Sequence, residues 1–173
     1  MLDSIPAQFE NCIPNNCLST VTHNSFKVFD RENDCCYICT ENEPKSLCYF
    51  TVNNPTNKPL NFLAIDKCTL TGDKDKKCDC AIFDNSLFYF IEMKTASSAS
   101  RSKRRGDAYM QLKSTIGIFK ERINFDNYEI LALISFGQSY TIPRTNSTHM
   151  GRRKELFDLY RAKLVEGNLI EFF

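Results

Sequence analysis

From residue 60 onward, the chain alternates short apolar runs with polar connections. An apolar run of about four to eight residues, bounded by polar or turn-forming residues, is typical of a buried strand. Four segments fit that description: 60–65, 78–83, 87–94 and 128–136. Apolar positions recur instead at helical spacing over 107–123 and 153–166, so we expect a helix at each, the second one stopped by Gly167. Residues 169–173 are a candidate last strand.

Residues 1–59 carry a weaker pattern. Ser4 is placed to cap a short helix over 5–12, and Asn53-Asn54-Pro55 ends the clearest early strand. Three strands are expected in this part: 25–29, 36–40 and 46–52. Together, these elements predict a single α/β domain over 1–173, in which a central mixed β-sheet is flanked by helices. Its Cys-rich N-terminal part covers 1–59, and its core covers 60–173.

Charge is almost balanced, with 22 basic and 21 acidic residues among 173, so the total neither requires nor excludes a nucleic-acid partner. The distribution of the charge is more informative. Four basic residues cluster in a polar segment, 95–105, for which we expect a loop: Arg101, Lys103, Arg104 and Arg105. A second basic run, Arg152-Arg153-Lys154, opens the last predicted helix, where positive charge opposes the helix macrodipole.

The chain opens without the apolar run of a secretory leader, and no stretch is long and apolar enough to span a membrane. These features predict a cytoplasmic protein without a membrane partner, in which thiols stay reduced. We therefore expect its nine cysteines, all before residue 81, to be small buried hydrophobic residues. The spacing of Cys36 and Cys39 leaves two alternatives open, a redox pair or a zinc site completed by Cys12, Cys17 or Cys48.

The most specific chemistry lies at the end of the run LFYFIEMK, residues 87–94. Successive side chains of a strand point to opposite faces, so Glu92 and Lys94 share one face while Met93 points to the other. Charges at the end of a buried strand are costly unless they are paired or bind a metal. The simpler alternative is that Glu92 and Lys94 form a surface ion pair at the end of the strand.

The strands on either side of Asp84-Asn85-Ser86 are expected to form a hairpin. If its turn is centred between Asn85 and Ser86, Asp79 faces Glu92 across the two strands. Two carboxylates directly opposite each other repel, and a divalent cation between them turns that cost into a binding site. Mg²⁺ suits such a place because it takes one or two carboxylates, several waters and phosphate oxygens. Lys94 lies on the same face, where an ammonium group can orient a water or stabilise charge on a phosphate.

This arrangement resembles a known family. Asp79, followed after twelve residues by Glu92-Met93-Lys94, is similar to the D…(D/E)xK signature of the PD-(D/E)xK nuclease superfamily. The resemblance covers residues 60–136, and the longer string IDKC…KKCDCAIF…FYFIEMK looks like a subgroup of small bacterial proteins of this type. Cys78 replaces the Pro that gives the family its name, and Met93 stands where Leu is common. The resemblance implies a restriction-endonuclease-like core.

The resemblance also implies roles for the central residues. Asp79 and Glu92 would ligate Mg²⁺ or Mn²⁺, with the backbone carbonyl of Met93 as a further ligand. Lys94 would act on the nucleophilic water.

Three further residues are candidates for accessory roles. Superfamily members often carry a Gln-Leu pair on the following helix, which Gln111-Leu112 matches, and some add an acidic residue on the first helix, for which Glu10 is the candidate. Asp66 ends the strand over 60–65, so it is either a neighbour of the same site or a turn carboxylate.

These residues and the resemblance predict a metal-dependent endonuclease that hydrolyses phosphodiester bonds, with DNA favoured over RNA and bacterial anti-phage defence as the setting. The basic segment 101–105 leaves the catalytic strand, where it either contacts phosphates or is a solvated charge run. A chain of this size has little room for a separate recognition domain, so we expect a homodimer or a subunit of a larger defence complex.

Two other functions stay open: a non-catalytic nucleic-acid-binding or scaffold subunit with a nuclease-like fold, and a cysteine-based zinc module. Histidine chemistry is not expected, because the only histidines, His23 and His149, have no supporting pattern and are expected in solvated loops.

Overall fold

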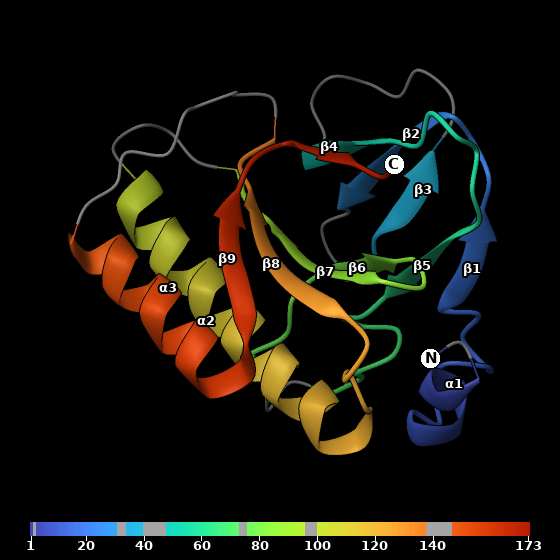
Figure 1. Cartoon of the computed structure of the whole chain (residues 1–173), viewed down its shortest axis with the longest axis horizontal. Coiled ribbons are helices and arrows are strands. Elements are labelled where there is room, and N and C mark those ends of the chain that lie inside the picture. The colour runs from blue at the N-terminus through green and yellow to red at the C-terminus, as the bar shows by residue number, and fades with distance from the viewer. Residues whose placement is uncertain (2, 31–33, 40–47, 73–75, 96–99, 138–146) are drawn as a thin grey trace.

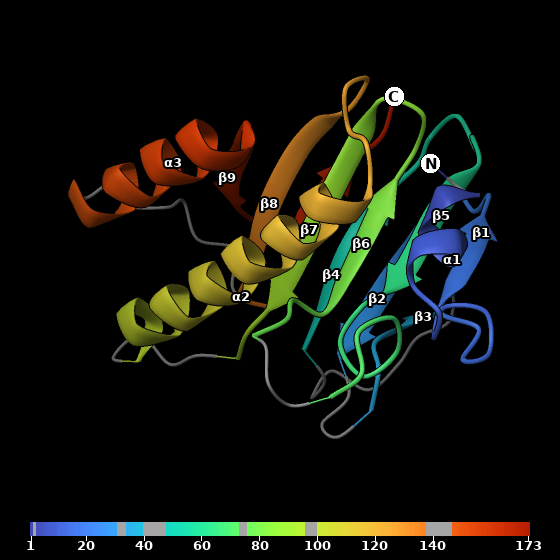
Figure 2. The ribbon, with the colours of Figure 1, turned by 90° about the horizontal axis from the view of Figure 1, so that it is seen from below.

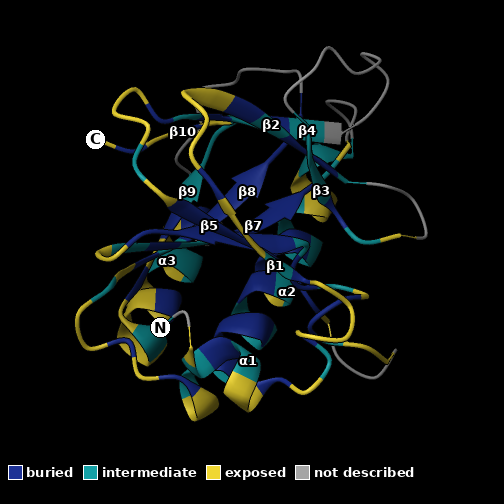
Figure 3. Cartoon of the chain, turned by 90° about the vertical axis from the view of Figure 1, so that its right-hand side faces the viewer, coloured by how far each residue is buried: buried dark blue, intermediate teal, exposed yellow. Residues whose placement is uncertain are grey.

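A computed structural model describes residues 1, 3–30, 34–39, 48–72, 76–95, 100–137 and 147–173. These residues build three layers, seen edge-on in Figure 3: a four-stranded sheet, a six-stranded sheet and a layer of helices. The helices are α1 (Ser4–Gln8), α2 (Arg101–Arg122) and α3 (Ser147–Tyr160). In the described residues, no helix is long and apolar enough to cross a membrane.

The six-stranded sheet has the order β1-β5-β6-β7-β8-β9 and crosses the molecule in Figure 1. Its strands are β1 (Leu18–Val21), β5 (Leu60–Ala64), β6 (Cys80–Phe83), β7 (Leu87–Met93), β8 (Glu129–Ser135) and β9 (Ala162–Glu166). Pairing is antiparallel from β1 to β7, whereas β7, β8 and β9 run parallel to one another. The central position of β7 explains its apolar composition, because both of its faces are covered.

The four-stranded sheet has the order β10-β4-β2-β3 and lies over one face of the larger sheet. Its strands are β2 (Ser25–Asp30), β3 (Tyr37–Cys39), β4 (Cys48–Asn53) and β10 (Leu169–Glu171). β4 contacts β7, and Tyr89 of β7 packs edge-on against Phe172, which follows β10. The smaller sheet therefore brings residues from both ends of the chain against the central strand.

The helices cover the other face, and Figure 2 shows α2 lying along β7. Its apolar residues Ala108, Leu112, Ile116 and Phe119 are fully buried at the spacing of one helix face. The ring of Phe119 lies 5.2 Å from that of Phe90, and an aromatic core extends around this pair. Burying a Phe side chain contributes about 1.5–3 kcal/mol, so this core anchors α2 to the end of the strand pair β6–β7.

The α/β class is confirmed, and most strands lie within two residues of their predicted ends. The expectation of one central sheet is wrong: the strands predicted over 25–29, 36–40 and 46–52 form a second mixed sheet. Residue 40 and residues 46–47 of those predictions lie outside the described residues. β1 was not predicted because Ser19 and Thr20 at its centre are exposed on the edge of the sheet.

The helix predicted over 153–166 is also wrong. α3 ends at Tyr160, and Arg161 adopts a left-handed backbone conformation with φ 55°, which stops the helix. Residues 162–166 then form β9, in which buried Ala162 and Leu164 alternate with exposed Lys163. Leu159, one of the apolar residues of the predicted helix, is 55% exposed. Apolar positions on both sides of Arg161 happened to match a helical period, and Gly167 follows a strand.

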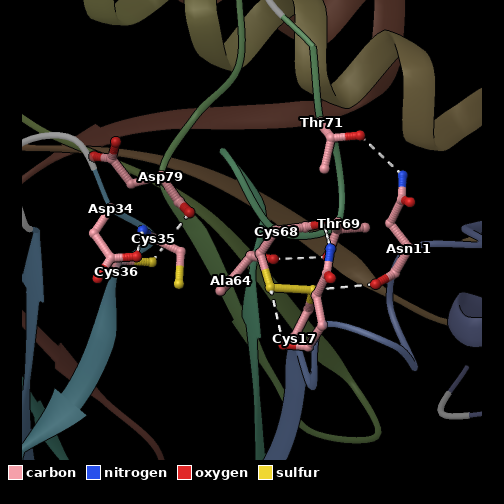
Figure 4. Close-up of a disulfide and its surroundings, with 11 residues drawn as sticks. Asn11, Cys17, Asp34, Cys35, Cys36, Ala64, Cys68, Thr69, Thr71 and Asp79 are labelled. Atoms are coloured by element: carbon pink, nitrogen blue, oxygen red, sulfur yellow. Dashed lines mark hydrogen bonds between the residues drawn. A yellow bond between two sulfur atoms is a disulfide. The ribbon is translucent and has the colours of Figure 1, made fainter.

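The expectation of reduced cysteines is wrong for one pair, because Cys17 and Cys68 form a disulfide (Figure 4). It joins the residue before β1 to the turn after β5, two segments that β1–β5 pairing already brings together. Four of the other cysteines are free and buried, as expected: Cys12, Cys36, Cys78 and Cys80.

The disulfide should contribute measurably to stability. It closes a loop with a sequence separation of 51, for which the chain-entropy estimate is about 4 kcal/mol. We expect the double variant Cys17→Ser, Cys68→Ser to lose up to about that much free energy of unfolding in urea. Reductant should destabilise the wild type and leave the double variant unchanged; equal sensitivity of the two proteins to reductant would contradict the assignment.

Candidate functional site

The β6–β7 hairpin has the register that its turn predicts. Cys80 pairs with Ile91 and Phe83 with Phe88, and the regular pairing ends there, one residue short of the predicted Asp79–Glu92 pair. At Asp79 the ladder changes, because its N–H donates to the carbonyl of Ile91 at 3.1 Å. Its Oδ2 then accepts a hydrogen bond from the N–H of Met93 at 2.6 Å. The Asp79 carboxylate thereby caps the end of β7.

The main chain of Asp79 is held by two further segments. Its carbonyl accepts from the N–H of Ile65 at 2.9 Å and from the thiol of Cys36 at 3.1 Å (Figure 4). Ile65 follows β5, and Cys36 precedes β3 of the smaller sheet. Both sheets therefore fix the position of this carboxylate.

Glu92 is fully buried near the end of β7, and its Oε1 forms an ion pair with the ammonium of Lys94. Its Oε2 is also buried and has no hydrogen-bond partner among the described residues. Lys94 is anchored through its backbone N–H, which donates to Ser135 of β8 at 2.7 Å. The expected sharing of one face by Glu92 and Lys94 is confirmed by this ion pair, but the pair is buried at Glu92 rather than lying on the surface.

Burial governs the protonation of both carboxyls. Desolvation, and then the charge of Asp30, raises the pKa of Asp79 to about 7, although the Met93 N–H and Lys94 oppose the rise. Desolvation and the charge of Asp79 raise the pKa of Glu92 well above its usual range. Burial alone would lower the pKa of Lys94, but the facing carboxylates outweigh it and raise the pKa, so Lys94 is an ammonium at neutral pH.

Asp30 was not predicted as part of this site. It ends β2 of the smaller sheet, and its charge raises the pKa of both Asp79 and Glu92. Burial in turn raises the pKa of Asp30, while Lys67 and Lys94 lower it. The one signal in the sequence was an acidic residue at the end of an alternating strand, a feature that Asp66 shares.

The predicted accessory residues Gln111 and Asp66 contact the main chain at Asp79 or just before it. Gln111 of α2 donates to the carbonyl of Lys77 at 2.8 Å, and Thr115, one turn later, accepts from the N–H of Cys78 at 2.8 Å. The carboxylate of Asp66 forms an ion pair with the ammonium of Lys77, with 4.0 Å between the charged atoms. The backbone N–H of Asp66 donates to the carbonyl of Asp79 at 3.3 Å. Gln111 thus positions the segment before Asp79, and Asp66 lies beside the site.

Residues 96–99 of the predicted loop 95–105 lie outside the described residues, and its basic part is instead the start of α2, which begins at Arg101. Arg105 donates to both carboxylate oxygens of Glu166 at 2.7 and 3.1 Å, and Arg101 lies 3.8 Å from the same carboxylate. Arg101 also stacks over Phe136. Apolar periodicity missed this turn because two arginines occupy its inward face. Lys103 and Arg104 are exposed.

The other candidates lie apart from Asp79 and Glu92. Glu10 is exposed and follows the end of α1. His149, expected in a solvated loop, is instead 2% exposed within α3, whereas His23 is exposed as expected. Of the three cysteines proposed to complete a zinc site with Cys36 and Cys39, the disulfide removes Cys17 and leaves Cys12 and Cys48.

Among the residues that the structure describes, no group of three or more His, Cys, Asp or Glu side chains is arranged to hold a metal ion. The candidate ligands are therefore the two carboxylates of Asp79 and Glu92, with the backbone carbonyl of Met93. Such a set suits Mg²⁺, which takes few protein ligands and keeps several waters.

Removing the charge of Asp79 should stabilise the chain in metal-free buffer. A carboxyl whose pKa is raised on folding favours the folded state at low pH and loses that contribution as the pH rises through about 7. Asn can still accept the Met93 hydrogen bond. We expect Asp79→Asn to raise the melting temperature at about pH 8 by about 2 °C or more, because 1 kcal/mol corresponds to about 2–4 °C for a chain of this size.

Asp84 is the matched control for that variant. Burial raises its pKa, but the hydrogen bonds from Lys58 at 2.7 Å and from the turn outweigh burial and lower it. Asp84→Asn should therefore lower the melting temperature under the same conditions. If both variants shift the melting temperature in the same direction, the ionised form of Asp79 does not destabilise the fold as expected.

Comparisons of the chain with protein-family models, with curated proteins and with solved structures find no match. A functional assignment therefore depends on the geometry of Asp79, Glu92 and Lys94 and on the resemblance of their motif.

Proposed function

We propose that the chain is a metal-dependent endonuclease whose site is formed by Asp79, Glu92 and Lys94. The observation that carries the proposal is the environment of Glu92. Its carboxylate is fully buried, lies near a second carboxylate and leaves Oε2 without a hydrogen-bond partner among the described residues. A buried carboxylate oxygen without a partner costs free energy, and a cation at that position would remove the cost.

The donors fit a hard divalent cation. Asp79, Glu92 and the Met93 carbonyl are all oxygen ligands, which Mg²⁺ and Mn²⁺ prefer. When bound, the cation would act as a Lewis acid on the phosphodiester and increase the acidity of a coordinated water. The neighbouring Asp30 and Asp66 add negative potential that favours a cation over an anion at this place.

The residues of the chain would divide the remaining work. Lys94 is an ammonium held by Glu92, so it can donate hydrogen bonds to a water or a phosphate oxygen and cannot take a proton at neutral pH. The Met93 N–H fixes the orientation of Asp79. Gln111 and Thr115 hold the segment that leads to Asp79, so they are positioning residues.

Fold-level features support the same proposal. An antiparallel pair, β6 and β7, carries the acidic residues; the long helix α2 follows, and β8 returns parallel to β7. That order is compatible with a restriction-endonuclease-like core. DNA as the favoured substrate, a role in bacterial anti-phage defence, and a homodimer or larger defence complex follow from the resemblance alone and are parts of the proposal.

A non-catalytic nucleic-acid-binding or scaffold subunit is the second candidate. Two observations favour this candidate. Lys94 already pairs with Glu92, and the described residues contain no group of three side chains that could hold a metal ion. Both would be expected of a site that stabilises the fold and has no catalytic metal. The two candidates differ in one property, because only the first requires cleavage that depends on Glu92.

Cleavage of plasmid DNA, single-stranded DNA and RNA with Mg²⁺ or Mn²⁺ tests the proposal. Glu92→Gln and Lys94→Met keep the size of each side chain, so we expect both to fold and to lose at least about 100-fold in rate, the scale of one electrostatic catalytic group. The matched control is the exposed pair Glu129–Lys163 at 2.6 Å, whose variants Glu129→Gln and Lys163→Met should cut like the wild type. Wild-type cleavage by Glu92→Gln would exclude this site.

The first turn of α2 carries a basic residue that pairs with Glu166, Arg105, and two exposed ones, Lys103 and Arg104, and substitutions should affect stability in the first case and DNA binding in the second. Arg105→Ala removes a two-point contact with the buried Glu166, so it should lower stability by about 1–3 kcal/mol. Lys103→Ala, Arg104→Ala leaves the fold intact and should weaken DNA binding. Urea unfolding and the salt dependence of DNA binding measure the two effects. The assignment is wrong if Arg105→Ala is as stable as the wild type.

A further inference from the structure

A cavity of about 390 Å³ lies between α2 and the described parts of the β5–β6 connection. Its lysines, Lys67, Lys76 and Lys77, come from the connection, while Asp107 and Gln111 come from α2. The proposed function gives this cavity no role.

The cavity adjoins the candidate site. Asp66 lines it, and the N–H of Asp66 donates to the carbonyl of Asp79 at 3.3 Å. Gln111, on the opposite wall, bonds the carbonyl of Lys77, two residues before Asp79. The cavity is therefore linked to the main chain of Asp79 through Asp66, and to the segment before Asp79 through Gln111.

Lys67, one of the residues that line the cavity, has a left-handed backbone conformation. Its φ is 60°, in the left-handed region that non-glycine residues rarely adopt, yet its side chain is exposed and does not pack in the core. Neighbouring bonds impose the turn: Cys68 is in the disulfide, and buried Thr69 donates its hydroxyl to Ala64 at 2.6 Å (Figure 4). Strain that the surroundings maintain without a packing benefit is typical of functional positions.

The described lining carries three lysines against two aspartates, Asp66 and Asp107, so its net charge is positive. The ammonium group of Lys77 pairs with Asp66 and donates to the carbonyl of Gly72. Its charge is therefore offset by residues that line the cavity. Lys67 and Lys76 are exposed. Arg104 lies one helical turn before Asp107 on the same stripe of α2 as Gln111, and it is exposed on that side. None of the described lining residues is aromatic, so the lining offers contacts to a phosphate and no platform for stacking a base.

We propose that this cavity binds a backbone phosphate of the nucleic acid whose neighbouring phosphodiester lies at Asp79 and Glu92, with Lys67 and Lys76 as its ligands. The inference builds on the proposed function and adds the path of the strand. The substrate runs from the end of β7 across Asp66 toward α2. Arg104 extends the same positive path, whereas Arg101 and Arg105 are committed to Glu166.

Fluorescence anisotropy with a labelled single-stranded oligodeoxynucleotide, in EDTA so that cleavage plays no part, tests the cavity. Each lost phosphate contact should reduce the slope of log affinity against log salt by about 0.7. We expect that loss for Lys67→Asn and for Lys76→Gln; Asn is chosen because it tolerates a left-handed backbone. Lys67→Arg keeps the charge and should keep the slope, and Lys163→Gln, on β9, is the distant control. Unchanged slopes in both cavity variants, or an equal loss in Lys163→Gln, would overturn the proposal.

A second arm separates a nucleic-acid phosphate from a free anion. Inorganic phosphate is titrated calorimetrically into the wild type and Lys67→Asn. Binding that requires Lys67, together with unchanged oligonucleotide slopes, would assign the cavity to a free anion and overturn the proposal.

The two proposals can also fail separately. Cavity-dependent slopes in a chain that cuts no substrate would support the phosphate site and contradict the nuclease. Glu92-dependent cleavage, together with slopes that are unchanged by Lys67→Asn and Lys76→Gln, would support the nuclease and contradict the phosphate site.

Discussion

The structure depends on the way it places carboxylates at the ends of neighbouring buried strands. Asp79 and Glu92 are both desolvated, and the charge of Asp79 raises the electrostatic cost of ionising Glu92. One internal cation, Lys94, offsets part of that cost through its ion pair with Glu92. The surroundings add two more acidic residues, Asp30 and Asp66, rather than removing charge. A fold selected only for stability would place apolar residues here, and this electrostatic cost is the basis for proposing a cation at this position.

The rest of the fold serves to keep these groups in position. The smaller sheet delivers Asp30 and the Cys36 thiol, which bonds the main chain of Asp79. On the opposite face, α2 is anchored by its aromatic contacts and holds the segment before Asp79 through Gln111 and Thr115. The disulfide fixes the turn that carries Lys67 beside the same segment. Each layer therefore contributes a contact within a few residues of the carboxylates.

Local features of this fold could be predicted from the sequence, because they depend on neighbours in the chain. The β6–β7 register followed from a turn centred between Asn85 and Ser86, and the alternation along β7 placed Glu92 and Lys94 on one face. Features that depend on long-range packing could not be predicted. Asp30 reaches the site only because β2 belongs to a second sheet, and the Cys17–Cys68 pair exists only once β1 lies beside β5. The boundary between α3 and β9 was missed because a left-handed residue, Arg161, left no mark in the apolar pattern.

Calorimetric titration of Mn²⁺ into the wild type and into Glu92→Gln tests the central claim most directly. We expect the wild type to bind Mn²⁺ and to release protons, because carboxyls with raised pKa values must ionise to become ligands. Affinity should therefore increase as the pH rises through about 7, the pKa of Asp79. Glu92→Gln should lose this binding while remaining folded. A wild type that binds no Mn²⁺, or a Glu92→Gln variant that binds it equally well, would contradict the assignment of Asp79 and Glu92 as a metal site.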